Sequence, residues 1–229
     1  YHHHIAKLKS SYILPIHKLH MTQKQIRTRF APSPTGFLHV GGLRTALYAY
    51  LFARQQNGKM LLRIEDTDQE RLVPGATEHL QSILQEMGID YDEGPDKGGP
   101  VGPYIQSQRL DIYKKYADEL IKKRGAYYCF CTKERLDELR ENQTKRKLAP
   151  MYDHHCRTLP KEDIEKNLAA KMPYIIRQAI PLDTKIVFND LIRDRMEFDS
   201  NTLDDHVLMK SDGFPTYHLA VVVDDHLME

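Results

Sequence analysis

Long apolar runs, cysteines and excess charge of either sign are all scarce in this 229-residue chain. No run of about 18 apolar residues exists, which argues against a membrane span. Three cysteines are too few for the disulfide framework of a secreted protein, so we expect a reducing, cytoplasmic setting. The formal net charge is only +1, so any surface for nucleic acid must be a local patch. Hydrophobic residues make up 41% of the chain, enough for the core of one large or two modest domains.

The first 20 residues differ from the remainder. They begin with Tyr1 and three histidines, and they contain three lysines and no acid. His20 and Met21 would suit a junction before a natural start. We interpret residues 1–20 as a tag or linker, with a targeting peptide as the alternative, although such peptides usually carry arginine.

Residues 29–42, RFAPSPTGFLHVGG, lie between a predicted strand over 26–30 and a helix predicted over 43–56, where apolar residues recur at helical spacing. Gly41 and Gly42 would let a ligand approach the main chain where this helix begins. Free N–H groups and the helix dipole favour an anion at that place. His39, just before the glycines, can donate a hydrogen bond to a phosphate. A Rossmann-like turn without a ligand is the plainer interpretation.

A second strand is predicted over 59–64, and an acidic cluster, Glu65 to Asp68, follows it. Strand, helix and strand within about 40 residues indicate a right-handed parallel crossover, the unit of a doubly wound sheet. Ligands of such sheets bind beyond the carboxyl ends of the strands, so segments 29–42 and 65–68 are expected at one edge. By residue type alone, the cluster could equally be a solvated loop with a helix cap.

The sequences of these segments resemble those of a known family. Phe-Ala-Pro-Ser-Pro-Thr-Gly over 30–36, followed by Leu-His-Val-Gly-Gly over 38–42, is similar to the first signature of the glutamyl-tRNA synthetases, a class I aminoacyl-tRNA synthetase family. His39 begins the tetrapeptide that the family writes HIGH, and Gly42 replaces its last histidine. The resemblance implies a Rossmann-like doubly wound parallel sheet with an inserted α+β acceptor-binding subdomain. It also implies that His39, Gly41 and Gly42 meet the phosphates of ATP.

A pocket for a free amino acid needs an anion beside a cation, because the ligand carries an ammonium and a carboxylate. Glu65 can take the ammonium, and the resemblance gives Arg29 the acid of the substrate side chain. The same resemblance implies backbone and hydroxyl contacts from Ala31 and Ser33, and a contact between bound glutamate and Tyr217.

Between these segments the chain alternates helical and extended patterns. We expect helices over 74–87, 110–124 and 133–147, strands over 126–131, 174–177 and 185–188, a turn over 190–193, an irregular stretch before 109, and an apolar run over 219–223 that returns to the nucleotide fold. Residues 114–147 hold eleven bases and six acids, a local balance of +5. This patch could be a solvated helical face, or a surface that follows the phosphates of a tRNA acceptor arm.

The cysteines raise the question of a metal. Cys129, Cys131 and Cys156 offer three thiols, and zinc usually takes four ligands. On spacing alone, buried thiols and a structural zinc site both remain possible. Some members of the family, and their glutamyl-queuosine relatives, bind zinc through these three positions together with the tyrosine at Tyr152. His154 and His155 are rival fourth ligands.

The resemblance covers residues 29–229 and divides the chain into parts. After the tag or linker, we expect the first half of the nucleotide-binding catalytic domain over 21–109, the inserted subdomain over 110–205, and a return to the catalytic domain over 206–229. The family's lysine loop and anticodon-binding domain do not follow. We therefore expect an amino-terminal catalytic fragment that is poorly active alone.

The function that the resemblance implies is attachment of L-glutamate to tRNA(Glu), with ATP and Mg²⁺, through a glutamyl-adenylate. The partners would be L-glutamate, ATP and the acceptor arm of the tRNA, bound by a monomer with no membrane contact. Two alternatives remain open: a glutamyl-queuosine tRNA(Asp) synthetase, and a non-catalytic RNA-binding module stabilised by zinc.

Overall fold

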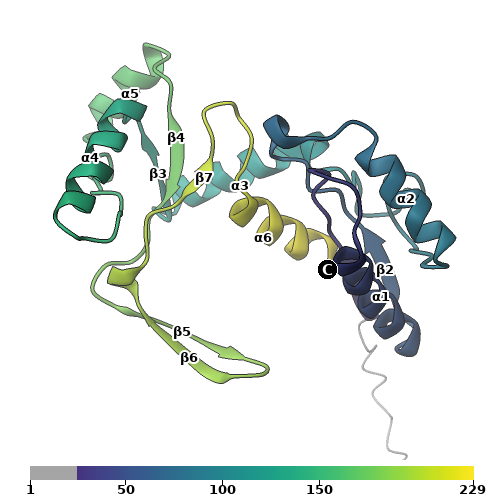
Figure 1. The fold of residues 1–229 in the computed structure, drawn as a ribbon. Helices are drawn as coiled ribbons and strands as arrows, with labels where there is room; N and C mark the ends of the chain where they lie inside the picture. Colours follow the sequence, from purple (N-terminus) through teal and green to yellow (C-terminus); the bar gives the residue numbers. More distant parts are fainter. Residues whose placement is uncertain (1–24) are drawn as a thin grey trace, which may run out of the picture.

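The computed structural model describes residues 25–229, so the tag or linker predicted over 1–20 lies outside the described part. Strands β1 (Arg27–Phe30) and β2 (Lys59–Leu62) form a parallel pair, with Arg29 opposite Leu61. Helix α1 (Val40–Gln55) connects them and packs on both (Figure 1). The predicted parallel crossover is thereby confirmed. Isolated parallel bridges from Leu61 to Glu93 and from Ile64 to Ile105 extend the same layer.

The core of this half lies between the sheet and two helices. Met60, Leu62 and Ile64 point from β2 and the residue beyond it into a cluster that Leu80 and Leu84 close from α2 (Ala76–Glu86). The apolar residues of α2 fall on one face, as the sequence predicts, and the helix ends before Gly88, whose φ of 66° favours glycine. A short 3-10 turn, η1 (Gln69–Arg71), follows the acidic cluster.

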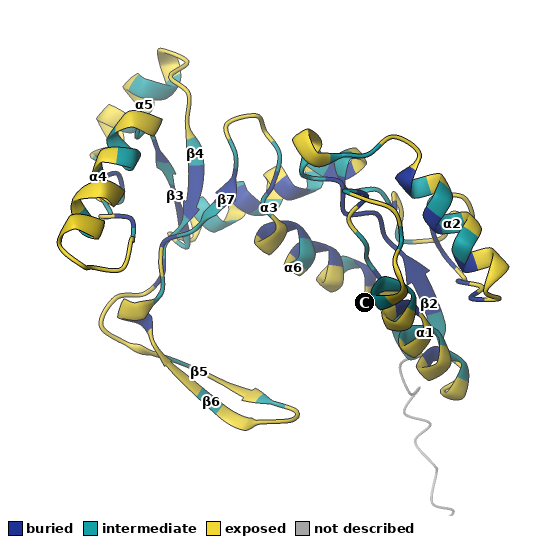
Figure 2. Ribbon diagram, in the orientation of Figure 1, coloured by how far each residue is buried: buried dark blue, intermediate teal, exposed yellow. Residues whose placement is uncertain are grey.

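The second part of the chain is built on an antiparallel sheet with strand order β3-β4-β7. Its elements are η2 (Gln106–Arg109), α3 (Leu110–Lys122), β3 (Ala126–Cys129), α4 (Lys133–Lys145), α5 (Lys161–Ala169), β4 (Ile175–Gln178) and β7 (Val207–Met209). Buried strand residues such as Ile176 and Leu208 pack with Tyr113 and Ala117 of α3. Figure 2 shows the resulting contrast: the sheet is buried, whereas α4 and α5 are largely exposed.

A long β-hairpin extends from the part of the chain that contains the β3-β4-β7 sheet. Strands β5 (Lys185–Asp190) and β6 (Asp194–Asp199) pair antiparallel with each other, and the hairpin projects away from the rest of the molecule (Figure 1). The rings of Phe188 and Phe198 stack with centroids 5.9 Å apart. The predicted turn over 190–193 is its tip, and η3 (Ser200–Thr202) leads back to β7.

The final element, α6 (Tyr217–Met228), joins the two halves. The apolar run over 219–223 is helical, and it packs on α3 and β7 through Leu219, Ala220 and Val223. From the same helix Asp224 and Asp225 reach arginines of the nucleotide-binding half. Between residues 25 and 229, no helix combines the length and the apolar character that crossing a bilayer requires.

Candidate functional site

The start of α1 is organised by His39. This residue is the N-cap, and its Nδ1 accepts a hydrogen bond of 3.1 Å from the amide of Gly41. Because Nδ1 is the acceptor, a neutral ring carries its proton on Nε2, where it can be donated outward. His39 is exposed, and no acid lies in the first turn of the helix. This helix N-terminus therefore has the charge and the donors that suit a phosphate.

The two glycines make that arrangement possible. A Cβ atom on Gly41 would lie 2.8 Å from Cε1 of the His39 ring, and one on Gly42 would lie 2.7 Å from Leu38 Cδ1. The amides of Gly41 and Gly42 were both expected to meet phosphates. In this structure the Gly41 amide already donates to Nδ1 of His39. Gly42 lies in the first turn, where amides have no acceptor within the helix.

A cavity of about 570 Å³ opens beyond the carboxyl end of β2. It contains three of the predicted substrate residues, Ser33, Glu65 and Tyr217, and it joins the loop after β2 to the start of α6. Its full lining is Ser33, Glu65, Thr67, Asp68, Gln69, Glu70, Arg71, Lys210, Asp212, Pro215, Thr216 and Tyr217. Four acids face two bases in this lining, so the cavity favours a cationic group such as an ammonium.

The fourth predicted substrate residue, Arg29, lies beside this cavity. It lines a neighbouring hollow of about 200 Å³ together with Arg63 and Asp225. The hydrogen bond to Asp225 raises the pKa of Arg29 most, and the negative charge of Glu65 raises it further. Arg29 and Glu65 therefore lie within electrostatic reach of each other, as the sequence predicts. Ala31 is half-buried, and the described contacts do not place it in either hollow.

Glu65 is a buried carboxylate at the edge of the sheet. It is 8% exposed, and burial raises its pKa above the ordinary value although the hydrogen bond from Arg63 opposes the shift. Arg63 Nη2 donates to Glu65 Oε1 at 2.8 Å. Half of the Glu65 carboxylate is thus held by the protein, and the residue still faces the cavity.

Two basic residues near this site, Arg63 and Lys210, were not predicted from the sequence. Arg63 is buried and bonded to both Glu65 and Asp225, and Lys210 Nζ donates to the carbonyl of Thr67 at 3.2 Å. Asp224 and Asp225, which follow the apolar run over 219–223, both form ion pairs with arginines. A basic residue within the apolar run KMLLRI is the one sequence signal that points to Arg63.

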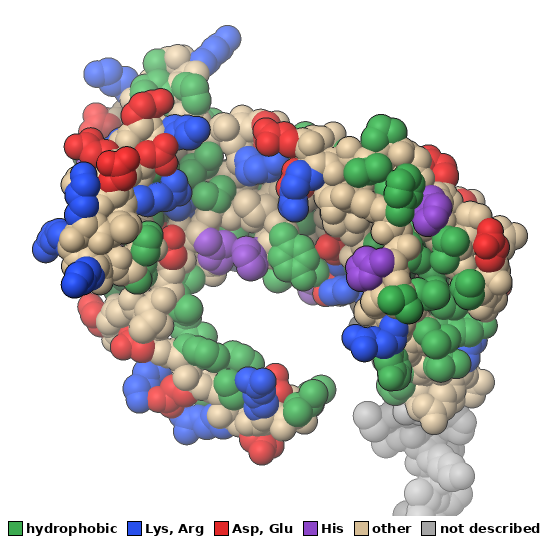
Figure 3. All heavy atoms as spheres, in the orientation of Figure 1, with side chains coloured by type: hydrophobic (Ala, Val, Ile, Leu, Met, Phe, Trp, Pro, Cys, Tyr) green, Lys and Arg blue, Asp and Glu red, His purple; other side chains and the backbone are tan. Residues whose placement is uncertain are grey.

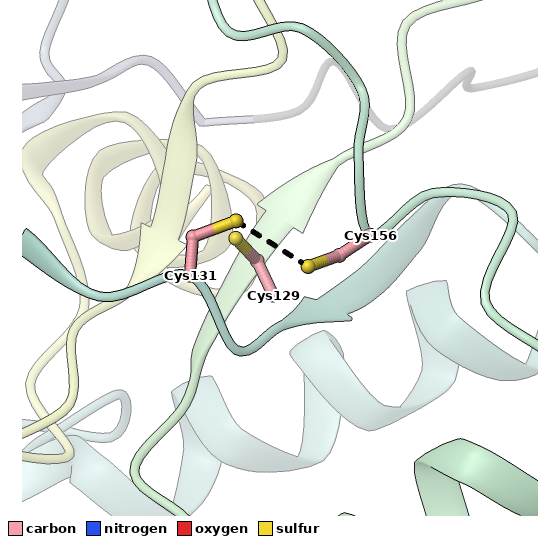
Figure 4. Close-up of side chains that lie close together, drawn as sticks. All are labelled: Cys129, Cys131 and Cys156. Atoms are coloured by element: carbon pink, nitrogen blue, oxygen red, sulfur yellow. Dashed lines mark hydrogen bonds between the residues drawn. The ribbon is translucent and has the colours of Figure 1, made fainter. Parts of the chain in front are cut away.

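The cysteines form a second candidate site. Cys129 ends β3, Cys131 follows it, and Cys156 comes from the loop before α5 (Figure 4). All three Sγ atoms lie within 4.8 Å of one another, and Cys131 Sγ is 3.5 Å from Cys156 Sγ. The hydroxyl of Tyr152 lies 3.3 Å from the sulfurs of both Cys129 and Cys131. The four predicted ligands therefore converge on one point.

The surroundings of the thiols suit a cation held by thiolates. The hydrogen bond from Cys156 lowers the pKa of Cys129, and donating that bond raises the pKa of Cys156. Thiolates bound to Zn²⁺ at about 2.3 Å would lie about 3.8 Å apart in a tetrahedron, close to the observed spacing. The rival His154 is directed elsewhere, since its Nε2 lies 3.6 Å from Asp205 Oδ2. The residues present therefore fit a zinc ion.

Similarities to known proteins agree with this arrangement. The family described as tRNA synthetases class I (E and Q), catalytic domain, matches residues 25–229. A glutamate--tRNA ligase of Clostridium tetani is 60% identical over 208 residues, which are 91% of this chain and 43% of that protein. One of Clostridium novyi is 57% identical over the same share of this chain and 42% of its own length.

A solved structure shares the fold as well. It is described as a glutamate tRNA ligase from Elizabethkingia meningosepticum in complex with its amino acid, and it superposes with a TM-score of 0.84 at 48% identity. The superposition covers 90% of this chain and 42% of that one. The chain thus spans less than half the length of the relatives that it matches.

Proposed function

Since this chain belongs to the class I tRNA synthetases of the glutamate and glutamine type, we propose that it contains the glutamate-binding part of a glutamate–tRNA ligase. The observation that carries the proposal is the placement of Glu65 and Arg29. A carboxylate and a guanidinium lie within electrostatic reach of each other at neighbouring strand ends, beside a cavity lined with acids. Glutamate is a small zwitterion with an extra acid, and it needs both groups.

In this proposal each predicted residue has one role toward the amino acid. Glu65 accepts from the ammonium, and Arg29 donates to the side-chain carboxylate. The hydroxyls of Ser33 and Tyr217, which line the cavity, and the backbone of Ala31 complete the pocket. Arg29, a cation beside this acidic cavity, is the group that selects a negatively charged side chain over its amide.

ATP would bind at the start of α1. The family uses ATP with Mg²⁺, and we assign the triphosphate to Nε2 of His39 and the amide of Gly42, while the amide of Gly41 holds the His39 ring. A carboxylate oxygen of glutamate attacks the α-phosphorus, the bond to pyrophosphate breaks, and a glutamyl-adenylate forms. A hydroxyl of the terminal ribose of tRNA then attacks the acyl carbon, and AMP leaves. Positioning and charge stabilisation suffice for both steps, and Mg²⁺ neutralises phosphate charge.

The tRNA acceptor arm would lie along the hollowed face of the molecule. Figure 3 shows this face between the nucleotide-binding half and the β5–β6 hairpin. The +5 segment over 114–147 includes α4, whose surface is largely exposed and basic at its end. Lysines and arginines there can follow phosphates without reading bases. The division into a catalytic part over 21–109 and 206–229 and an acceptor-binding insertion over 110–205 belongs to this proposal.

A structural Zn²⁺ held by Cys129, Cys131, Cys156 and Tyr152 would stabilise the insertion. The group would link β3 to the loop before α5, and it would take no part in the chemistry. Arg135 and Arg177 lie beside the sulfurs and would offset the negative charge of a zinc bound to three thiolates.

Two measurements test the proposed function. Calorimetric titration of the chain with L-glutamate and with ATP is expected to show binding of both, and Arg29→Ala is expected to weaken glutamate at least about tenfold while ATP is unaffected. Glutamate-dependent exchange of pyrophosphate into ATP, with the Clostridium tetani ligase as positive control, tests activation. A chain that ignores glutamate and ATP alike would be a binding module. Transfer to queuosine-modified tRNA(Asp) in place of tRNA(Glu) would indicate the queuosine enzyme instead.

A further inference from the structure

Four side chains of alternating charge form a continuous chain through the candidate site. Glu65 accepts from Arg63 Nη2 at 2.8 Å, and Arg63 Nη1 donates to Asp225 Oδ1 at 2.8 Å. Asp225 in turn accepts two hydrogen bonds from Arg29, at 2.7 and 2.8 Å. The two ends of this chain are the two groups assigned above to the ammonium and to the side-chain acid of glutamate.

The contact between Arg29 and Asp225 uses one edge of the guanidinium. Nε and Nη2 of Arg29 donate to the two oxygens of Asp225, so the pair is bidentate and side-on. An arginine has five N–H donors in a rigid plane, and this contact uses two of them. The contact with Asp225 leaves Nη1 of Arg29, and the second N–H of Nη2, unused. The end-on edge of the guanidinium is therefore open to a second carboxylate.

Arg63, which joins Glu65 to Asp225, is buried and cannot turn freely. The side chain of Arg63 is 1% exposed, and its Nε also lies 3.7 Å from Asp224, which is fully buried. Asp224 is itself fixed by Arg109 Nε at 2.8 Å and by the hydroxyl of Tyr113 at 2.8 Å. A guanidinium surrounded by three carboxylates in the interior has one favourable orientation. Arg63 thus fixes Asp225 relative to Glu65.

We propose that Asp225 and Arg63 are positioning residues of the glutamate site: Asp225 presents the free edge of Arg29 to the substrate, and Arg63 sets the distance between Arg29 and Glu65. The inference rests on the proposed function and adds a determinant of specificity to it. Helix α6 carries Asp225 and also begins with Tyr217, so one rigid element positions two substrate contacts.

A fixed distance between Glu65 and Arg29 favours a ligand whose ammonium and side-chain carboxylate are separated by a matching distance. Glutamate and aspartate carry the same charges and differ by one methylene, so a pocket with loose ends would distinguish them poorly. The network therefore predicts that loss of Asp225 weakens glutamate and also lowers the preference for glutamate over aspartate. A merely structural role of Asp225 predicts no change in the preference for glutamate over aspartate.

The chain provides a matched control on the same strand. Arg27 of β1 forms a bidentate pair with Glu93, at 2.8 and 3.0 Å, just as Arg29 does with Asp225. Arg27 lines the smaller hollow beside Arg29, whereas Glu93 lines neither hollow. Glu93→Gln removes a more deeply buried ion pair two residues along the strand, and Glu93 has no hydrogen bond to Arg29, Arg63 or Glu65.

The experiment compares Asp225→Asn, Asp225→Glu and Glu93→Gln with the unaltered chain by titration with L-glutamate, L-aspartate and ATP. Asp225→Asn is expected to raise the glutamate Kd at least about tenfold, to lower the ratio of aspartate Kd to glutamate Kd, and to leave the ATP Kd within about twofold. Asp225→Glu retains the charge on a longer side chain, so it should fold even if Asp225→Asn does not fold. It should also change the ratio of aspartate Kd to glutamate Kd. Glu93→Gln should leave all three Kd values within about twofold.

Two results would overturn the inference. One is an unchanged glutamate-to-aspartate ratio in both Asp225 variants. The other is an equal loss of glutamate and ATP binding in the Asp225 and Glu93 variants, which would assign Asp225 to stability alone. If the unaltered chain bound no glutamate, the proposed function itself would be refuted, and this inference with it.

Discussion

The guanidinium of Arg177 lies over the ring of Tyr152, with its central carbon 4.0 Å from the ring centroid. Nη1 of the same arginine donates to the carbonyl of Asp205 at 2.8 Å, and its Nε is buried without a partner within residues 25–229. Arg177 also contacts Cys129 and helps to lower the pKa of that thiol. A buried cation on β4 thus faces the one cluster of thiols that the described residues contain. It is a counterion for the negative charge that a metal site would carry there.

Zinc should copurify with the chain at about one ion per molecule, because three thiols and a phenol converge on one point. Removing the ion with a chelator should lower the Tm. Metal analysis after dialysis checks the stoichiometry, and Cys131→Ser should reduce it to near zero. Arg177→Met retains all four ligands, and by removing the neighbouring charge it should weaken zinc by about 10- to 100-fold. Full zinc content in Cys131→Ser would mean that the ion is held elsewhere.

Glutamate binding should weaken in acid. Burial raises the pKa of Glu65, so this carboxylate becomes protonated at a pH above the ordinary range for glutamate side chains and then no longer attracts an ammonium. Burial acts to raise the pKa of Asp225 as well, but the hydrogen bonds from Arg29 and Arg63 outweigh burial. The pKa of Asp225 is therefore lowered, and this carboxylate stays ionised in that pH window. The glutamate Kd should therefore be constant near neutral pH and rise as the pH falls through the Glu65 pKa.

The control for this pH profile is Glu65→Gln, which should bind weakly and without the same pH dependence. The contribution of Glu65 itself to stability changes in the opposite direction. A raised pKa in the folded state means that the folded chain binds more protons than the unfolded chain in that window, so Glu65 stabilises the fold as the pH falls. An identical profile in Glu65→Gln would refute the assignment.

ATP binding should separate two roles of His39. The ring caps α1 through Nδ1, and we assign its outward Nε2 to a phosphate. His39→Asn retains a good N-cap, but its shorter side chain cannot place an N–H group where Nε2 of His39 lies, so it should keep the Tm and weaken ATP by about tenfold. His39→Ala should lose both, with about 1 kcal/mol less stability. Titration with ATP and thermal unfolding of both variants give the comparison, and equal ATP affinity in His39→Asn and the unaltered chain would contradict the prediction.

The part of the chain built on the β3-β4-β7 sheet should depend on Asp205, which is fully buried. This carboxylate accepts from the hydroxyl of Tyr127 at 2.7 Å, from the amide of Ile180 at 2.9 Å and from Arg157. Asp205→Ala should reduce the free energy of unfolding by about 3–5 kcal/mol, because Arg157 would lose its buried counterion. Asp137→Ala, which removes an exposed partner of Arg140, should change it by less than about 1 kcal/mol. Denaturant titration measures both, and similar losses would contradict the argument.

Local patterns were enough to determine the family, the fold class and most elements. The strand–turn–helix over 26–56 and the parallel partner over 59–64 are confirmed, because a Pro/Gly turn and an apolar period require only short-range information. The class I synthetase fold is confirmed by the family match over 25–229 and by the solved relative. The roles of the predicted site residues remain predictions, although Ser33, Glu65 and Tyr217 do share one cavity.

What only the tertiary structure decided is how charges far apart in the sequence pair. Arg63 and Asp225 are 162 residues apart, and Arg29 and Asp225 are 196 apart, so no spacing rule could join them. An arginine within an apolar strand and an aspartate within an apolar helix each look unfavourable alone, because a buried charge is costly without a partner. Their pairing depends on the return of α6 to the sheet, and that return is a property of the packed core.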